Sequence, residues 1–361
     1  MTAGNATKIA PGGTATGVYH INTQPQTIII VVITICASHV QVAVSRSMNE
    51  AASISIAEKH EKWMAEHGRS YKDELEKDMR FKIFKQNLEY IDKVNNNNNN
   101  SNEGINRTYK LGTNQFSDLT NAEFRASYAG NSMAITSQHS SFKYQNLTQV
   151  PTSMDWREKG AVTSIKNQGG CAACWAFSAV AAVEGITQIS SGNLIRLSEQ
   201  QLLDCSSNGN SGCVAGKSDI AFKYIIKNQG IATEADYPYH QVQGSCGREH
   251  AAAAKISSYE VLPSGDEQAL LKSVSMQPVS INIEGTGQDF KNYKGGIFNG
   301  VCGTQLDHAV TIIGFGTTED GTKYWLIKNS WGDTWGEAGY MRIQRDEGLC
   351  GIGTQAAYPI T

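Results

Sequence analysis

Apolar and polar positions alternate with different periods in different parts of the chain. Between about residues 172 and 192, apolar residues such as Trp175, Val183 and Ile186 recur at steps of three and four, which predicts a long helix that ends at Gly192. Shorter helices are predicted at Leu197–Leu203 and Asp219–Asn228. Beyond about Lys255, β-branched runs separated by Gly-containing turns predict strands. These strands are Val279–Ile283, Ala309–Phe315, Lys323–Lys328 and Tyr340–Ile343.

The segment Ser53–Asn95 also has helical periodicity. Six of its residues recur at steps of three or four and share one helix face. They are Glu76, Arg80, Phe84, Asn87, Ile91 and Asn95. Glu76 and Arg80 have the i,i+4 spacing of an ion pair. A plain amphipathic surface helix is the alternative interpretation.

Two further segments precede the first Cys-rich stretch. In Gly112–Asp118 the alternation predicts an extended strand with Asn114, Phe116 and Asp118 on one face. The Asn run 95–100 predicts a flexible loop. The segment Ala126–Gln149 is rich in Ser, Gln and Asn, has no clear period, and is predicted to be an exposed linker that a protease can cut.

The N-terminal region differs from the rest of the chain. The run Thr27–Cys36 is apolar but too short to span a bilayer, so it is predicted to be a signal-peptide core rather than a buried strand. Ala43-Val44-Ser45 offers small residues for cleavage. This implies entry into the secretory pathway, with a vacuolar or lysosomal destination and secretion both open. N-x-[ST] sequons at Asn99, Asn106 and Asn146 are candidate glycan sites.

Charge and cysteine usage narrow the classes of function. The formal net charge is −3, which gives no electrostatic reason to expect nucleic acid or a membrane surface as a partner. Of the eight cysteines, Cys36 lies in the apolar run. If Cys174 is a free thiol, six remain, which suits three disulfides in an oxidising compartment. Six cysteines allow 15 pairings, and their spacing does not choose among them.

The strongest chemical candidate is Cys174, in the stretch Gln168-Gly169-Gly170-Cys171-Ala172-Ala173-Cys174-Trp175. A thiol at a helix N-terminus is favoured as the nucleophilic thiolate. Gln168 adds an amide donor for a developing oxyanion. A buried structural cysteine is the plain alternative, and Cys171 with Cys174 also forms a C-x-x-C that is typical of redox pairs or half a zinc site.

Residues downstream supply a base and its orienting partner. His308 begins a predicted strand about 130 residues after Cys174, and Asn329 ends another about 150 residues after it, in the sequence Asn329-Ser330-Trp331-Gly332. With the Cys motif, these residues resemble the papain-like cysteine proteases, and among them the senescence-associated plant enzymes. The helical face from Glu76 to Asn95 and the Gly112–Asp118 motif resemble the two propeptide motifs of that family.

The resemblance implies a fold, an organisation and a mechanism. The expected fold is α+β, with a mainly helical subdomain and an antiparallel barrel-like subdomain that enclose the active-site cleft. Residues 1–45 would be an N-terminal extension and signal peptide, 46–149 an inhibitory propeptide and 150–361 the catalytic domain. Cys174 would attack the peptide carbonyl, paired as thiolate with a protonated His308 that Asn329 orients. Gln168 and the Cys174 N–H would form the oxyanion hole, and Trp331 would shield the His308–Asn329 bond.

The resemblance also implies the disulfides and the substrate wall. The expected pairs are Cys171–Cys213, Cys205–Cys246 and Cys302–Cys350. The residues expected to contact substrate are Gly216, Ser218, Asn282, Leu306, Ala309 and Gln355. Gly216 would pair with the substrate backbone, and the other five would line one pocket. Because three of these five carry an amide or a hydroxyl, we expect a pocket more polar than the family norm. The alternative is an ordinary apolar pocket, in which both amides turn to backbone partners and Leu306 and Ala309 line the space. Ala172, Val214 and Ala215 depart from the family pattern and are expected to alter specificity rather than abolish activity.

The expected partners follow from the same resemblance. They are protein and peptide substrates, the chain's own propeptide as inhibitor, and cystatin-type inhibitors, with a monomeric enzyme that needs no cofactor or metal. The precursor is expected to mature on acidification, through carboxylates such as Glu76 and Asp118 that are paired in the bound propeptide. A catalytically silent papain-like storage or binding protein is the competing hypothesis.

Overall fold

The structure is a computed structural model in which residues 55–97, 107–130, 142–247 and 250–361 are described. The chain divides into two units, Met1–Glu61 and Lys62–Thr361. In the first unit the described residues, 55–61, are helical. The predicted signal core, its cleavage site, and the sequons at Asn99 and Asn106 lie outside the described residues.

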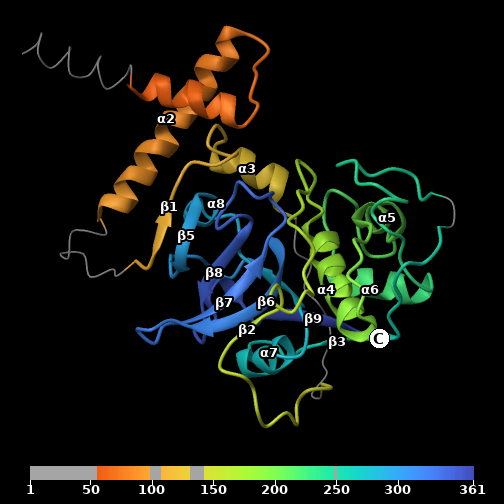
Figure 1. Ribbon diagram of the computed structural model, residues 1–361. Helices are drawn as coiled ribbons and strands as arrows, with labels where there is room; N and C mark the ends of the chain where they lie inside the picture. The colour runs from red at the N-terminus through yellow and green to blue at the C-terminus, as the bar shows by residue number, and fades with distance from the viewer. Residues whose placement is uncertain (1–54, 98–106, 131–141, 248–249) are drawn as a thin grey trace, which may run out of the picture. The chain divides into compact units, whose positions relative to one another are not determined.

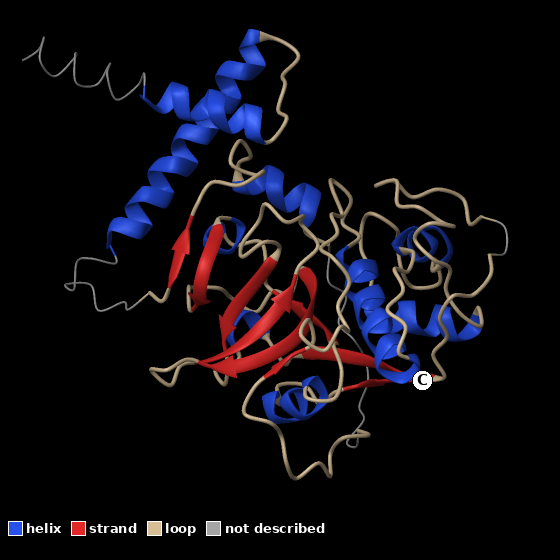
Figure 2. Ribbon diagram, in the orientation of Figure 1, coloured by secondary structure: helices blue, strands red, loops and turns tan. Residues whose placement is uncertain are grey.

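A single sheet forms the centre of the second unit (Figure 2). Among the described residues it has nine strands in the order β1-β5-β8-β7-β6-β4-β9-β3, with β2 paired to β6. The β5–β8 pair is parallel and the other pairs are antiparallel. The strands are β1 Tyr109–Leu111, β2 Met154–Asp155, β3 Ser258–Val261, β4 Val279–Ile283, β5 Tyr293–Phe298, β6 His308–Thr317, β7 Lys323–Lys328, β8 Tyr340–Gln344 and β9 Gln355–Ile360.

The predicted fold class is confirmed, with one change to the sheet. The predicted strands correspond to β4, β6, β7 and β8 within a few residues. Within the described strands the order has two ends, so the sheet is open and mixed rather than barrel-like. One end is β1, which precedes the catalytic residues in sequence and pairs with β5.

The helices gather mainly beside the sheet (Figure 1). They are α2 Glu74–Asn97, α3 Asn121–Tyr128, α4 Cys174–Ser191, α5 Glu199–Cys205, α6 Ser218–Lys227, α7 Glu267–Val274, α8 Gln288–Lys291 and the 3₁₀ turn η2 Leu349–Gly351. The long helix α4 ends as predicted at Gly192, whose φ of 79° is in the left-handed region that favours glycine. Ser198 caps α5 by accepting a hydrogen bond from the N–H of Gln201.

Two large apolar clusters form most of the core of the second unit. One surrounds the sheet and includes Phe116, Phe124 and Trp331. The other surrounds α4 and α6 and includes Trp175, Phe222 and Ala309. Nearly every residue in the first three turns of α4 is buried, because this helix lies between the other helices and β6. None of the described helices combines the length and the apolar character needed to cross a membrane.

The segment before residue 98 is not one helix. Residues 62–66 are helical, but α2 begins only at Glu74, because Gly68 has a φ of 59° and the chain turns there. The predicted face is present on α2, with Phe84, Asn87 and Ile91 buried. The ion pair expected between Glu76 and Arg80 is wrong: Arg80 instead pairs with Glu123 at 3.0 Å.

The strand predicted at Gly112–Asp118 is also wrong. Residues 115–118 form a turn, in which the Asn114 side chain accepts a 2.9 Å hydrogen bond from the N–H of Phe116. Asn114, Phe116 and Asp118 are nevertheless all buried. An Asn side chain that binds its own main chain replaces the strand hydrogen bonds, which explains why alternation alone was misleading here.

Candidate active site

Cys174 is the first residue of α4 and, among the described cysteines, the one free thiol. Its side chain is buried, and burial raises the pKa of the thiol to about 11. The N–H groups of Ala309 and Trp175 contact the sulfur and oppose that rise. Since Ala309 follows His308 directly, the contact places the sulfur beside the residue expected to act as base. The N–H of Cys174 itself has no partner within the helix, because it lies in the first turn.

His308 and Asn329 meet at the ends of two paired strands, β6 and β7. His308 Nε2 and Asn329 Oδ1 are 2.8 Å apart. The ring of Trp331 stacks on the ring of His308 with a centroid separation of 4.5 Å. The other ring nitrogen, Nδ1, is buried without a hydrogen-bond partner. Burial lowers the pKa of His308 to about 4, and the hydrogen bond with Asn329 opposes this.

The Cys–His pair is therefore neutral in the precursor at neutral pH. A thiol with a pKa of about 11 is protonated, and an imidazole with a pKa of about 4 is not. Both shifts have the same physical cause, which is removal of the charged forms from water. Burial therefore opposes the thiolate–imidazolium pair that was expected from the sequence.

Gln168 links the loop before α4 to the end of β7. Its Nε2 donates to the Cys171 carbonyl at 3.0 Å, and its Oε1 accepts from the Ser330 hydroxyl at 2.7 Å. Its main-chain N–H donates to the Ser330 carbonyl at 2.8 Å. Gln168 is fully buried and held from both sides. One amide hydrogen of Nε2 is thus used by the Cys171 carbonyl, which leaves the second for another acceptor.

Residues 107–130 belong to the segment 46–149 that was expected to be the propeptide, and this segment is called the prosegment from here on. The prosegment covers the site directly. After α3, the N–H of Gly130 donates to the Asp307 carbonyl at 2.9 Å. A Cβ at Gly130 would lie 3.7 Å from Cys174 Sγ and 3.6 Å from the Ala172 carbonyl oxygen. The prosegment backbone therefore passes over the thiol, at the place where a substrate backbone would have to lie. An open cavity of about 740 Å³ flanks the crossing, with Ala172, Val214 and Leu306 among its lining residues.

Aromatic residues of the prosegment contact Trp331, the residue whose ring stacks on His308. Phe116 and Phe124 contact the Trp331 ring edge-on, with centroid separations of 5.6 Å and 5.2 Å. The Gln115 side chain donates to the Trp331 carbonyl. The prosegment thus contacts the ring that stacks on His308. Sequence analysis did not identify Gly130 or Gln115 as site residues, because neither lies in a pattern of its own.

Some of the residues expected to contact substrate lie in or beside the sheet, and the others lie among the helices. In the sheet, Asn282 is opposite both Ala309 and Gln355, and its Nδ2 donates to Gln355 Oε1 at 2.7 Å. Leu306 lies beside Gly351. On the helical side, Ser218 is the buried first residue of α6. Gly216 lies flat on the indole of Trp175, where a Cβ would come within 2.4 Å of the ring.

Six cysteines form three disulfides in the pairing that the resemblance implied. They are Cys171–Cys213, Cys205–Cys246 and Cys302–Cys350. The bond between Cys171 and Cys213 excludes the redox or zinc use of Cys171 with Cys174. Among the described residues, no group of three or more His, Cys, Asp or Glu side chains is placed to hold a metal ion.

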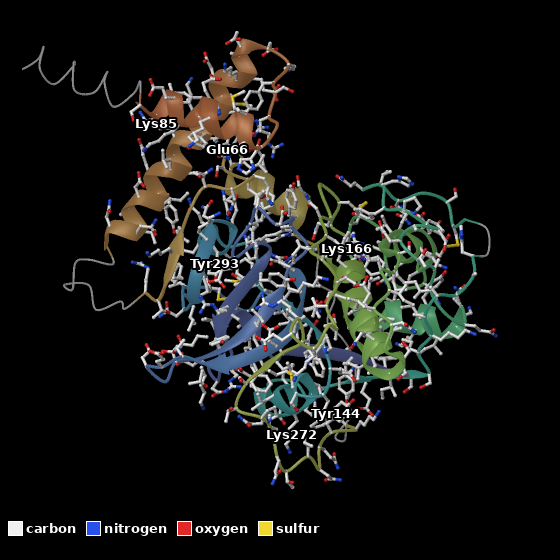
Figure 3. The ribbon with its side chains drawn as sticks, viewed as in Figure 1. Glu66, Lys85, Tyr144, Lys166, Lys272 and Tyr293 are labelled. Carbon is white, nitrogen blue, oxygen red and sulfur yellow. A yellow bond between two sulfur atoms is a disulfide. The ribbon has the colours of Figure 1, made fainter. Side chains whose placement is uncertain are left out.

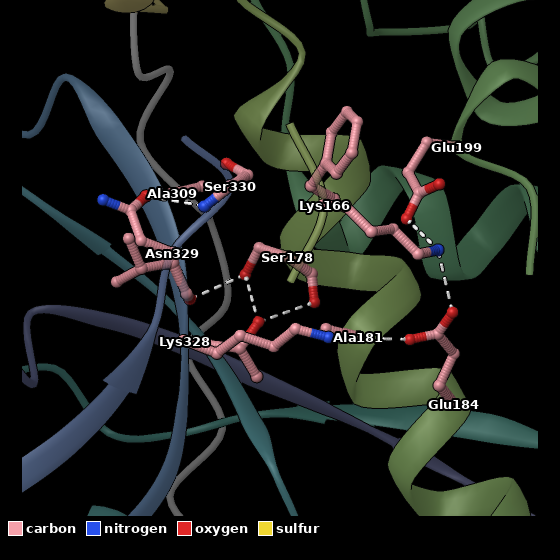
Figure 4. Close-up of a pocket in the computed structure, with 12 residues that line it drawn as sticks. Lys166, Ser178, Ala181, Glu184, Glu199, Ala309, Lys328, Asn329 and Ser330 are labelled. Atoms are coloured by element: carbon pink, nitrogen blue, oxygen red, sulfur yellow. Dashed lines mark hydrogen bonds and ion pairs between the residues drawn. The ribbon is translucent and has the colours of Figure 1, made fainter. Parts of the chain in front are cut away.

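A buried cluster of charges, not predicted from the sequence, lies behind the site (Figure 4). Lys166 Nζ contacts Glu184 at 2.9 Å and Glu199 at 2.6 Å, and Lys328 Nζ lies 4.0 Å from Glu184. Burial raises the pKa of Glu199 and lowers that of Lys328, whereas the charge of Lys166 opposes the rise at Glu199. The cluster joins α4, which begins at Cys174, to the strand that ends next to Asn329.

Comparisons with known proteins agree with this geometry. The family of papain family cysteine proteases matches residues 150–360, and the cathepsin propeptide inhibitor domain (I29) matches residues 60–124. The chain is 50% identical over 318 residues to the senescence-specific cysteine protease SAG12 of Arabidopsis thaliana, covering 84% of this chain and 90% of that protein. It is 46% identical to vignain of Ricinus communis, covering 83% and 85%.

A solved structure adds the likeness in three dimensions. The recombinant stem bromelain precursor superposes with a TM-score of 0.78 at 45% identity, over 85% of this chain and 99% of that one. The family match and a relative named as a cysteine protease favour an enzyme over a silent storage protein. This chain belongs to the papain family of cysteine proteases and is the zymogen of such an enzyme, with its own inhibitory propeptide and with peptides as substrates.

Proposed function

We propose that the chain is organised as a signal-bearing extension at 1–45, a propeptide at 46–149 and a catalytic domain at 150–361. The family matches at 60–124 and 150–360 support this division. Three disulfides, and an apolar run suited to a signal core, support entry into the secretory pathway. The final destination is a vacuole or lysosome, or the extracellular space. Cystatin-type inhibitors are proposed as partners by analogy with the family.

We propose the following roles for the processed endopeptidase. Once the prosegment leaves, water reaches Cys174 and His308, and they exchange a proton to form the thiolate–imidazolium pair. The thiolate attacks the substrate carbonyl, and His308 protonates the leaving amine to give an acyl-enzyme. His308 then removes a proton from water, which hydrolyses the acyl-enzyme and regenerates the thiol. Cys174 N–H and Gln168 Nε2 donate to the oxyanion in both steps.

The 2.8 Å contact between His308 Nε2 and Asn329 Oδ1 supports these roles best. It fixes the proton on Nε2, so the unpaired Nδ1 remains for the thiol and for the leaving amine. The test is Cys174→Ala in the full chain, followed by processing with an added protease. Peptide hydrolysis should fall to background while the unfolding midpoint of the precursor changes little, because a methyl replaces a thiol. Hydrolysis within a few-fold of wild type would contradict the assignment.

We also propose that Asn282, Gln355, Ala309, Leu306 and Ser218 line the pocket for the substrate residue second before the scissile bond, and that Gly216 pairs with the substrate backbone. The Asn282–Gln355 hydrogen bond supports a shared, partly polar floor for this pocket. This bond uses one N–H of the Asn282 side chain and the side-chain oxygen of Gln355. The Asn282 carbonyl oxygen and the Gln355 amino group are then the atoms that a polar substrate side chain can use.

A further inference from the structure

The prosegment has a second attachment, at Tyr144, which the sequence did not predict. The segment around it was expected to be an exposed linker, but residues 142–150 are described and partly ordered into turns. The Tyr144 ring stacks on the ring of Tyr358 with a centroid separation of 5.4 Å and an interplanar angle of 27°. Its hydroxyl donates to Gln277 Oε1 at 2.9 Å. In Figure 3, Tyr144 lies beside Lys272. Lys272 belongs to α7, a helix that carries no active-site residue.

The groups that receive Tyr144 are fixed by the catalytic domain itself. Gln277 is fully buried, and its Nε2 donates to the Pro359 carbonyl at 2.9 Å, which orients Oε1 toward the tyrosine hydroxyl. The Tyr358 hydroxyl donates to the Glu260 carboxylate. These bonds join residues that follow Val150 to one another, so they do not depend on the prosegment. The site is therefore arranged before a tyrosine enters it.

The same site also binds the backbone on each side of the tyrosine. Glu260 Oε2 accepts from the N–H of Lys143 at 2.7 Å, and Lys272 Nζ donates to the carbonyl of Gln145 at 2.7 Å. An anionic acceptor before the aromatic residue and a cationic donor after it give the bound peptide a direction. Two main-chain contacts and one aromatic ring with a hydroxyl are the features of peptide recognition rather than of loose linker packing.

We propose that Glu260, Lys272, Gln277 and Tyr358 form a peptide-docking surface, the Tyr144 seat, whose occupant is the chain's own segment 142–149. The seat lies wholly within the catalytic domain, so it survives a cut at the propeptide boundary, and segment 142–149 stays attached to the prosegment. The cleaved prosegment is then held at two places, over Cys174 and at the seat. Two linked contacts raise the effective concentration of each, so the prosegment keeps inhibiting after the cut. This inference rests on the proposed boundary near Val150.

The test uses the processed enzyme with Cys174 alkylated, and an acetylated, amidated peptide of residues 142–149. Binding is followed by ligand-detected NMR, which also registers weak complexes. The peptide with Tyr144→Phe should bind roughly 5-fold more weakly, because it lacks the hydroxyl that meets Gln277. The peptide with Tyr144→Ala should bind at least about 10-fold more weakly, because it also loses the stacked ring.

A matched pair of enzyme variants completes the test. Lys272→Ala should weaken binding of the wild-type peptide, whereas Lys323→Ala, on β7 where the lysine pairs with Asp346, should not. Equal binding of the wild-type and alanine peptides, or no binding of either, would overturn the proposal. Hydrolysis of a small fluorogenic peptide by the enzyme before alkylation is the separate readout for the proposed function. Binding with no hydrolysis would count against the catalytic assignment and leave the seat standing.

Discussion

The backbone of Gly130 lies over the sulfur of Cys174, close enough that a Cβ at Gly130 would be 3.7 Å from Sγ. Gly130 of the prosegment thus lies where a substrate carbonyl would have to lie for the sulfur to attack it. Burial of this site raises the pKa of the Cys174 thiol and lowers the pKa of the His308 imidazole, because it disfavours the charged form of each. Inhibition in the zymogen is therefore both steric and electrostatic.

Acidification should release the prosegment through His308. The covered state holds this imidazole with a pKa of about 4, whereas an exposed histidine has a pKa near 6.5. In the Cys174→Ala precursor, which cannot form the thiolate–imidazolium pair, the imidazole is neutral in both states above about pH 6.5 and favours neither. As the pH falls from about 6.5 to 4, the uncovered state takes up a proton that the covered state does not. The free energy that favours the covered state then falls by up to about 3 kcal/mol.

The measurement is the cutting rate of the Cys174→Ala precursor by an added acid-tolerant protease, as a function of pH. Cutting of the prosegment should accelerate between about pH 6.5 and 4, and His308→Gln should remove part of that acceleration. An unchanged pH profile in His308→Gln would place the acid sensitivity elsewhere.

Glu123 should contribute a second acid-sensitive step. Partial burial alone would raise its pKa, but hydrogen bonds from the Thr120 N–H and hydroxyl, and the Arg80 guanidinium at 3.0 Å, lower it overall. A carboxylate with a lowered pKa stabilises the folded state above its unfolded pKa, and this is lost as the pH falls through the folded value. Glu123→Gln should therefore flatten the acid end of the same cutting profile, whereas Glu89→Gln, on the exposed side of α2, should leave it unchanged.

Loss of the orienting amide should be milder than loss of the base. Asn329→Ala removes the acceptor for His308 Nε2 but leaves the imidazole in place. Since a hydrogen bond to a group that becomes charged contributes about 1.5–3 kcal/mol, kcat/KM should fall roughly 10- to 150-fold. His308→Ala should cost considerably more. If Asn329→Ala proved as damaging as His308→Ala, the amide would have a role beyond orientation.

The pocket floor should accept a polar substrate side chain. In a fluorogenic series that differs only at the residue second before the scissile bond, Gln should be cleaved at parity with Leu, because its carboxamide can pair with the free ends of the Asn282–Gln355 pair. The double variant Asn282→Ala, Gln355→Met should restore a preference for Leu. A strong preference for Leu or Phe in the unmodified enzyme would instead show that the two amides satisfy each other and leave an apolar pocket.

The charge cluster behind the site should matter for stability. Lys166→Met leaves the buried carboxylates of Glu184 and Glu199 without the cation that lies between them. The free energy of unfolding should fall by about 3–5 kcal/mol in denaturant titrations of the precursor. The double variant Lys166→Met, Glu199→Gln should recover a large part of that loss, because one of the two charges is gone. Additive losses in the double variant would mean that these residues do not interact.

Most of the catalytic half could be read from local patterns. The β-branched run Val279–Ile283 is the strand β4, with the predicted bounds, because a strand buried on both faces needs little beyond its own apolar residues. Helix α4 carries both its periodicity and its stop at Gly192 in the sequence. His308 and Asn329 could be placed at strand ends, and paired strands then bring them together.

The features that sequence analysis missed depend on contacts between distant residues. Lys166, Glu184, Glu199 and Lys328 are far apart in the chain, so no spacing identifies them as one cluster. Tyr144 lies in a polar segment with no period, and only its partners Gln277 and Tyr358 show that it is anchored. The alternation at Asn114 looks like a strand because a side chain that bonds to its own backbone leaves no trace in periodicity.

Cys174 is the proposed nucleophile, and the prosegment covers it in the precursor. The most direct measurement is alkylation by an epoxide directed at cysteine proteases, with the modified residue located by peptide mass spectrometry. The intact precursor at neutral pH should remain unmodified, and the processed enzyme should be modified at Cys174 alone, in proportion to the loss of hydrolysis. Equal modification of the precursor, or modification of the processed enzyme at any other residue, would contradict the account.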